Sequence, residues 1–299
     1  MSNLIRKVRD ALLHAGISPK KALSQNFLVN EDILDKQIEY ANLTHDDVVI
    51  EIGGGTGVLT EKLAKKAKHV YCYEYDDKLF KFLQSKFRND SNITIIHGDV
   101  LKVNFQPANK IIANLPYHIS SPITFKLLDF GFDLAILMYQ WEFALRMIAE
   151  PRTDDYSRLS ANLQYQCNVE ILELVKKGNF YPIPKVDSAI VKIIPKKEKL
   201  PVPVDQYRFV TMILFNTKNK LVSSIFYNFF KKVLPKEARF SFKKEIDTKI
   251  LHADKRVREL TVEELVEITK SLRKVLKENG MEKLLHVEAQ QIRDSEVSL

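Results

Sequence analysis

Seven short apolar runs alternate with helical patterns between residues 48 and 195, and this alternation constrains the fold more than any other feature of the sequence. Segments with helical spacing lie between most of these runs, at 57–67, 77–87, 121–131 and 141–150. Strands that are apolar almost throughout are typical of a parallel sheet that helices cover on both faces. The sequence therefore predicts a Rossmann-like α/β domain, with an antiparallel edge where the last two runs have little helix between them. The predicted strands are 48–53, 69–75, 93–98, 110–115, 133–140, 169–175 and 189–195.

A change in composition follows the last predicted strand. Residues 195–205 mix charge with proline and indicate a linker, after which 206–230 and 261–280 have helical patterns. Thr261 and Glu264 have the spacing of a capping box, and Gly280 is a plausible helix stop. We predict an α/β domain over 1–195 that includes an N-terminal helical extension over 1–47. A smaller all-α domain over 196–280 and a C-terminal tail over 281–299 would follow it.

The net charge of +8 is concentrated in one part of the chain. Residues 1–194 carry +1, residues 195–280 carry +9, and the last 19 residues carry −2. A basic segment of this kind favours a polyanionic partner, most plausibly nucleic acid. A well-solvated, lysine-rich helical surface would give the same pattern, so charge alone leaves both interpretations open.

Several classes of protein are disfavoured by the sequence. No apolar run approaches the roughly 18 residues that a membrane span needs, and the first residues do not resemble a secretory signal. Cys72 and Cys167 are the only cysteines, which argues against a disulfide framework or a zinc site and favours two buried thiols. We expect a cytoplasmic protein that has no metal site and no membrane partner.

A glycine-rich loop joins the first predicted strand to the helix after it. Its glycines at 53, 55 and 57 miss the dinucleotide spacing, because Val58 stands where the third glycine would fall. Glycine permits tight turns and close approach of the backbone to a ligand. A ligand at the carboxyl ends of the strands is the general expectation for such a sheet, although a glycine-rich turn without a ligand is the simpler alternative.

Acidic residues near the ends of three successive strands make that simpler alternative less attractive. These residues are Glu51, Glu74 and Asp99. Glu74 is placed to accept both hydroxyls of a ribose, and Asp99 could meet an adenine amino group. The arrangement describes an adenosine held without phosphates, which fits S-adenosylmethionine better than NAD or ATP.

The sequence Asn-Leu-Pro-Tyr at 114–117 ends the fourth predicted strand, beside the expected cofactor. An exocyclic aromatic amine is a poor nucleophile because its lone pair is delocalised into the ring. The Asn114 side-chain oxygen and the Leu115 carbonyl, freed by Pro116, could accept its two hydrogens while Tyr117 stacks on the base. Catalysis would then be mostly orientation with electrostatic support, and no strong general base is required.

A second aromatic residue, Phe180, precedes the prolines at 182 and 184. If it packs on the other face of the target, a base is held between two rings, as a flipped or unpaired base would be. Ordinary core packing is the alternative for this residue.

These motifs, taken in order, resemble those of the KsgA/Dim-type ribosomal RNA adenine dimethyltransferases. The resemblance implies a class I methyltransferase fold in which Asn26 and Leu28 contact the methionine end of the cofactor, above Gly53 and Gly55. Gln25 is a further cofactor-binding residue by the same resemblance, which assigns Asn114 to both cofactor and target. The implied reaction is dimethylation of N6 on two adjacent adenosines near the 3′ end of small-subunit rRNA, on the immature small subunit and by a monomer. The matching stretches are LSQNFLVN, EIGGGTGVLT, YEYD, HGDVL, ANLPYHISSPI, DYSRLS and FYPIPKVDSAIV.

The chain departs from the family at Ser24 and Ser157, where many members carry glycine, and at Trp141, where lysine is frequent. Three alternatives stay open: an Erm-type methyltransferase of large-subunit rRNA, a protein glutamine methyltransferase, and a ribosome-assembly factor whose methylation is incidental. The basic segment and Phe180 favour RNA as the substrate.

Overall fold

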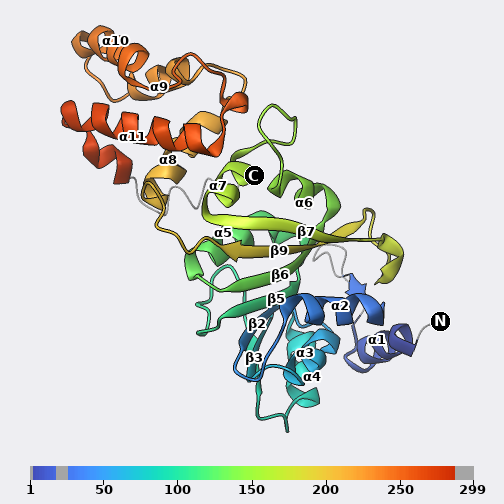
Figure 1. The fold of residues 1–299 in the computed structure, drawn as a ribbon. Coiled ribbons are helices and arrows are strands. Elements are labelled where there is room, and N and C mark those ends of the chain that lie inside the picture. Colours follow the sequence, from blue (N-terminus) through green and yellow to red (C-terminus); the bar gives the residue numbers. More distant parts are fainter. Residues whose placement is uncertain (1–2, 18–25, 287–299) are drawn as a thin grey trace. The chain divides into compact units, whose positions relative to one another are not determined.

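The computed structural model describes residues 3–17 and 26–286, which divide into two compact units (Figure 1). The first unit comprises residues 1–144 and 169–195, and the second comprises 145–168 together with the chain from 196 onward. The stretch 145–168, which the sequence analysis included in the α/β domain, therefore groups with the helical part.

A seven-stranded sheet in the order β4-β3-β2-β5-β6-β9-β7 forms the centre of the first unit. Each of the seven apolar runs is one of these strands. From β4 to β6 the pairs are parallel, and β9 pairs antiparallel with β6. The strands are β2 Val48–Ile52, β3 His69–Glu74, β4 Ile93–His97, β5 Lys110–Asn114, β6 Leu134–Gln140, β7 Cys167–Val175 and β9 Ser188–Pro195.

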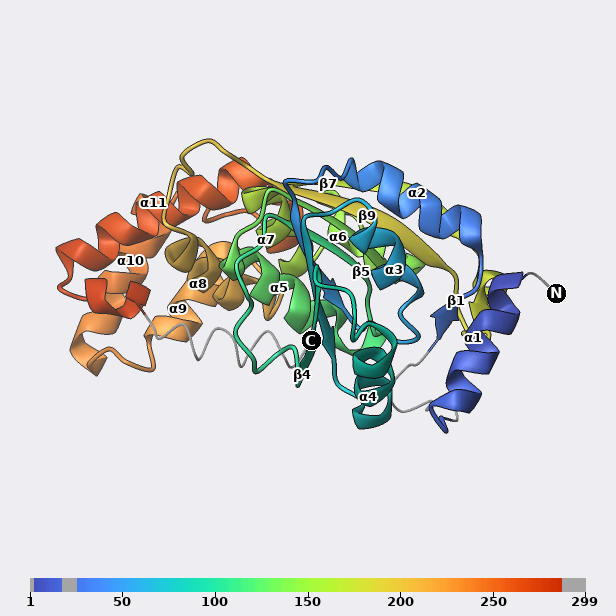
Figure 2. The same ribbon diagram turned by 90° about the horizontal axis from the view of Figure 1, so that it is seen from below.

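Helices cover both faces of this sheet, as the apolar strands require. Figure 2 shows α2, α3 and α4 on one side of the strands and α5 on the other. Helix α2 begins after Asn30, whose side chain accepts from the backbone of Asp32 and Ile33 and so caps it. The helices are α1 Asn3–His14, α2 Glu31–Ala41, α3 Val58–Ala64, α4 Asp77–Lys86, α5 Ser120–Phe130 and α6 Trp141–Met147, with a 3₁₀ turn Tyr117–Ile119 before α5.

A two-stranded antiparallel pair links the N-terminal segment to the end of the α/β domain. Strand β1 (Phe27–Leu28) pairs with β8 (Phe180–Tyr181), which follows a 3₁₀ turn at Lys177–Asn179. Leu28 lies opposite Phe180 in this register. Two motifs that are about 150 residues apart in sequence thus become neighbours.

The second unit is helical around its own apolar core. Its long helical pattern at 206–230 is interrupted at 216–221, where two asparagines favour a turn. The capping box of Thr261 and Glu264 is present, and Gly280 follows the last long helix at φ +68°. The helices are α7 Arg158–Gln166, α8 Val204–Phe215, α9 Val222–Phe230, α10 Arg239–Lys249 and α11 Val262–Glu278, with 3₁₀ turns Lys236–Ala238, Val257–Glu259 and Glu282–His286.

Candidate functional site

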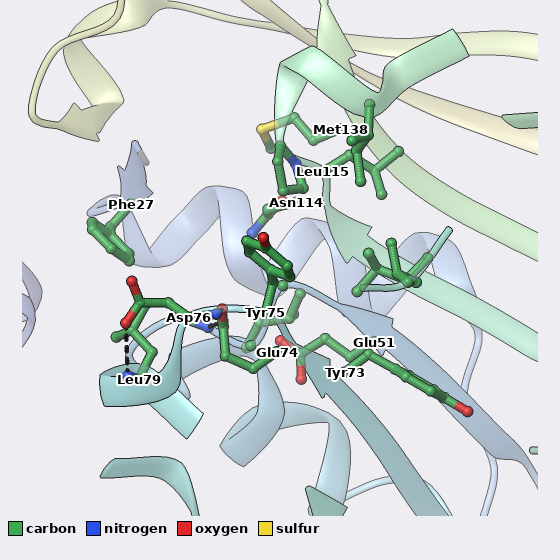
Figure 3. A pocket seen from close by; sticks show the side chains of 18 of the residues that line it. Phe27, Glu51, Tyr73, Glu74, Tyr75, Asp76, Leu79, Asn114, Leu115 and Met138 are labelled. Atoms are coloured by element: carbon green, nitrogen blue, oxygen red, sulfur yellow. Dashed lines mark hydrogen bonds between the residues drawn. The ribbon is translucent and has the colours of Figure 1, made fainter. Parts of the chain in front are cut away.

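A cavity of about 460 Å³ opens at the carboxyl ends of β2, β3 and β5. Parallel strands end together at this edge, so the residues that follow them converge there. Figure 3 shows labelled side chains around this cavity, among them Glu51, Glu74, Asn114 and Leu115. Of the predicted site residues, the cavity is lined by Asn26, Leu28, Gly53, Gly55, Glu74, Asp99, Asn114, Leu115, Pro116, Tyr117 and Phe180. Gln25 lies outside the described residues.

The glycine loop after β2 forms one wall because side chains do not fit there. Gly55 has φ +57°, a conformation that other residues rarely adopt, and a Cβ on it would lie 3.1 Å from the Phe27 ring. A Cβ on Gly54 would lie 2.2 Å from the Cys72 Sγ. The backbone of the loop is therefore packed against the sheet, with its other side toward the cavity.

Two buried carboxyl groups lie beside this loop. Glu74 accepts hydrogen bonds from the backbone N–H groups of Gly55 and Asp76, both at 2.9 Å, and burial raises its pKa. Glu51 is 2% exposed, and burial raises its pKa to about 8. Its Oε2 has no hydrogen-bond partner among the described residues. The Glu51 side chain is among those that line the cavity, although this oxygen itself is buried.

Asp99 is less buried than the two glutamates, with 30% of its side chain exposed. Its Oδ1 accepts from the backbone N–H of Leu101 at 3.0 Å, and its Oδ2 lies 3.5 Å from Lys102 Nζ. It lines the cavity from the loop after β4. A carboxylate in this position can accept a further hydrogen bond from a ligand.

The corner formed by Asn114, Leu115, Pro116 and Tyr117 follows β5 and lines the same cavity. The Asn114 Oδ1 accepts from Gln37 Nε2 at 2.9 Å. The Tyr117 hydroxyl lies 2.5 Å from the Ser188 Oγ, so the ring is held from β9. Both polar side chains of the corner are thus fixed by residues outside it.

Phe180 is 3% exposed and packs in the core of the first unit while it also lines the cavity. The two interpretations of this residue, core packing and contact with a target base, are therefore compatible. The structure brings it beside Leu28 through the β1–β8 pair.

Some residues at this site were missed by sequence reasoning. Gln37 belongs to none of the matching stretches, and Ser188 lies within FYPIPKVDSAIV without any signal that connects it to Tyr117, since each contacts its partner from more than 70 residues away. Tyr75 is 61% exposed and lines the cavity directly after Glu74, a position at which an aromatic ring can stack on a flat ligand. The alternation of polar and aromatic residues in YEYD could have indicated it.

Within residues 3–17 and 26–286, no group of three or more His, Cys, Asp or Glu side chains could hold a metal ion. No helix in that part of the chain is long and apolar enough to cross a bilayer. Cys72 and Cys167 are both buried and unpaired, as the sequence predicted.

One stretch of the second unit, at and just before α10, contains several exposed lysines and an exposed aromatic ring. Phe240 on α10 is 82% exposed, and Lys232, Lys236, Lys243 and Lys244 in the same part of the chain are exposed. Lysine side chains with an accessible aromatic ring match the requirements of an RNA surface. We call this set the α10 surface.

Lys218 has a different function from the one its charge suggests. Its Nζ donates to the backbone carbonyls of Asp154 at 2.7 Å and Tyr156 at 3.2 Å, so it anchors the loop before α7. Reversing its charge would disturb the second unit itself, and the α10 surface offers a cleaner test of nucleic-acid binding.

The chain is similar to known proteins over most of its length. The model of the ribosomal RNA adenine dimethylase family matches residues 17–274. A probable ribosomal RNA small subunit methyltransferase A of Pyrococcus abyssi is 42% identical over 264 residues, which cover 86% of this chain and 93% of that protein. The protein of the same description from Thermococcus sibiricus is 39% identical, and the match covers 89% of this chain and 97% of that protein.

Two solved structures are similar over most of the chain. A dimethyladenosine transferase of Plasmodium falciparum has a TM-score of 0.71 at 31% identity, covering 83% of this chain and 98% of that one. The 23S rRNA methyltransferase ErmE has a TM-score of 0.61 at 26% identity, covering 82% and 99%. Both are similar to this chain in its α/β and helical parts together, as the coverage shows.

Proposed function

The chain belongs to the ribosomal RNA adenine dimethylase family, and we propose that it dimethylates N6 of two adjacent adenosines near the 3′ end of small-subunit rRNA. The observation that carries this proposal is that four residues line one cavity. We assign Glu74 and Asp99 to a nucleoside, and Asn114 and Leu115 to the target amine.

The cofactor is S-adenosylmethionine, whose sulfonium supplies the methyl group. The residues at the cavity fit it: the glycine loop lines the cavity at Gly53, Gly54 and Gly55, and Glu74 retains lone pairs after accepting two backbone N–H groups. We assign the ribose to Glu74, the cofactor adenine to Asp99 and Tyr75, and the methionine end to Asn26, Leu28, Gly53 and Gly55. Glu51, largely protonated at neutral pH, can donate a hydrogen bond as well as accept one.

The protein contributes to the reaction mainly by orienting the target amine. In the first transfer the Asn114 Oδ1 and the Leu115 carbonyl accept the two hydrogens of the adenine amine, and in the second transfer one of them accepts the single hydrogen that remains. Both arrangements localise the lone pair on nitrogen. Pro116 has no N–H to compete there, and Tyr117, held by Ser188, presents its ring to the base. Phe180 bounds the cavity with a second ring. Fixed acceptors of this kind reduce the reorganisation needed to reach the transition state.

We assign RNA binding outside the cavity to the helical unit, and in particular to the α10 surface. Two observations support this: the +9 charge of residues 195–280 and the exposed Phe240. Base stacking on an aromatic ring contributes about 1–3 kcal/mol per base, and lysines bind phosphates without sequence preference.

Small-subunit rRNA is favoured over large-subunit rRNA by the relatives. Those at 38–44% identity are named small-subunit methyltransferases, whereas the ErmE structure is 26% identical. The Erm-type activity is the second candidate because its structure shares the architecture. We also propose that the substrate is the immature small subunit, and that the enzyme is a monomer and acts in the cytoplasm.

Replacing Asn114 by Ala separates the enzyme from an assembly factor. The proposal predicts that this variant loses methyl transfer by about 100-fold or more, since one fixed acceptor is removed. Binding to small-subunit particles should change little, because the RNA surface is intact. Unchanged methyl transfer would refute the assigned role of Asn114, and normal subunit maturation with the inactive variant would favour the assembly factor.

A further inference from the structure

Gln37 is a polar residue on the apolar face of α2. The buried residues of this helix are Ile33, Leu34, Gln37 and Ala41, and Gln37 is 0% exposed. A buried amide lowers stability unless hydrogen bonds compensate, and a leucine would fill the same face without that penalty. The presence of glutamine here therefore calls for a reason other than packing.

The only hydrogen bond recorded for the Gln37 side chain among the described residues is to the catalytic corner. Its Nε2 donates to the Asn114 Oδ1 at 2.9 Å, while its own Oε1 has no partner there. Gln37 itself does not line the cavity. Any effect on the reaction must therefore pass through Asn114.

The orientation of the Asn114 amide decides what it presents to a target. Rotation of the amide by 180° exchanges a carbonyl acceptor for an amino donor, and only the carbonyl can accept from an adenine amine. The carbonyl has two lone pairs, so Oδ1 can accept from Gln37 and from the target together.

We infer that Gln37 is a positioning residue that selects the reactive orientation of the Asn114 amide. This inference rests on the proposed function. The helix that carries Gln37 is joined to two neighbouring segments: Asn30 at its start donates to the Asn179 side chain in the turn Lys177–Asn179 at 2.9 Å, and Lys36 binds Glu173 of β7 at 2.6 Å. The hydrogen bond from Gln37 thus connects the Asn114 amide to α2.

Gln37→Met tests the inference, because methionine has a similar shape and cannot donate. We expect its kcat to fall on the order of 10- to 100-fold, as small misplacements of reacting groups do. The KM for RNA and the Kd for S-adenosylhomocysteine should stay within about two-fold of wild type, since no binding contact is lost.

Ile33→Ala is the matched control, since Ile33 is buried on the same face of α2 and does not line the cavity. It should lower the melting temperature and leave kcat unchanged. An unchanged kcat in Gln37→Met, or a loss that Ile33→Ala reproduces at equal loss of stability, would overturn the inference.

A second readout needs no methyl transfer. In protein labelled with ¹⁵N at asparagine, the Asn114 side-chain amide should give one sharp pair of signals that shifts or broadens in Gln37→Met. Signals identical to wild type would refute the inference. If wild-type protein fails to methylate rRNA while these signals still change, the proposed function fails and the positioning of Asn114 stands.

Discussion

Replacing Glu51 by Gln should remove a pH dependence from the stability of the first unit. Burial raises the pKa of Glu51 to about 8 in the folded protein, against 4.5 for an ordinary glutamate. The folded state therefore holds a proton between these values that the unfolded state has lost. Stability from this group is complete below pH 4.5 and is lost as the pH rises toward 8.

The size of the effect follows from the interval between the two pKa values. Over most of it the free energy of unfolding should fall by about 1.4 kcal/mol per pH unit from this group alone. From pH 5 to pH 8 the total is roughly 4 kcal/mol, a large share of the 5–15 kcal/mol that is typical of a domain. Glutamine has the shape of the protonated side chain and no titration, so the variant should lack this slope.

Denaturant unfolding of the cofactor-free protein at several pH values measures this directly. Trp141 is the only tryptophan and belongs to the first unit, so its fluorescence reports that unit. The stability difference between Glu51→Gln and wild type should be small at pH 5 and grow in favour of the variant toward pH 8. A difference that stays constant with pH, at equal denaturant slopes, would refute the reasoning.

Three further predictions concern packing, ring placement and RNA binding. Gly54→Ala should lower the free energy of unfolding by about 1–3 kcal/mol, measured by denaturant unfolding. The loss should be smaller in a Cys72→Ala background, because the added Cβ would lie 2.2 Å from the Cys72 Sγ. An equal loss in both backgrounds would contradict this packing. Ser188→Ala should lower kcat with unchanged cofactor affinity, since Tyr117 loses its 2.5 Å contact; an unchanged kcat would contradict it. Joint reversal of Lys243 and Lys244 to Glu should weaken RNA binding and flatten its salt dependence; an unchanged salt slope would remove the α10 surface from the interface.

Most of the sheet could be predicted because its signal is local. Each strand is an apolar run, and the carboxyl ends of neighbouring parallel strands must meet at one edge. Glu74 and Asn114 are the last residues of β3 and β5, and Asp99 follows β4, so their convergence on one cavity could be expected from strand order.

What could not be predicted depends on contacts between distant residues. Gln37 reaches Asn114 across 77 positions, and on sequence alone it is one more residue of an amphipathic helix. The sequence shows Lys218 only as one of many positive charges, whereas in the fold its Nζ donates to two backbone carbonyl groups. Phe240 and Phe242 are two residues apart, yet one is 82% exposed and the other 1%.

The boundary of the helical unit also could not be predicted from the sequence. Residues 145–168 lie between predicted strands and carry no composition shift, so nothing local separates them from the α/β part. Their contacts with the later helices, such as the bond from the Tyr156 hydroxyl to the Leu260 carbonyl at 2.8 Å, place them in the second unit.

The most direct test of the account is methyl transfer from labelled S-adenosylmethionine to small-subunit particles that lack the modification, with large-subunit RNA in parallel. The products are resolved as nucleosides. The account predicts N6,N6-dimethyladenosine in the small-subunit RNA alone. Label confined to large-subunit RNA would support the Erm-type activity instead, and tight particle binding without any methylated nucleoside would contradict the proposed reaction.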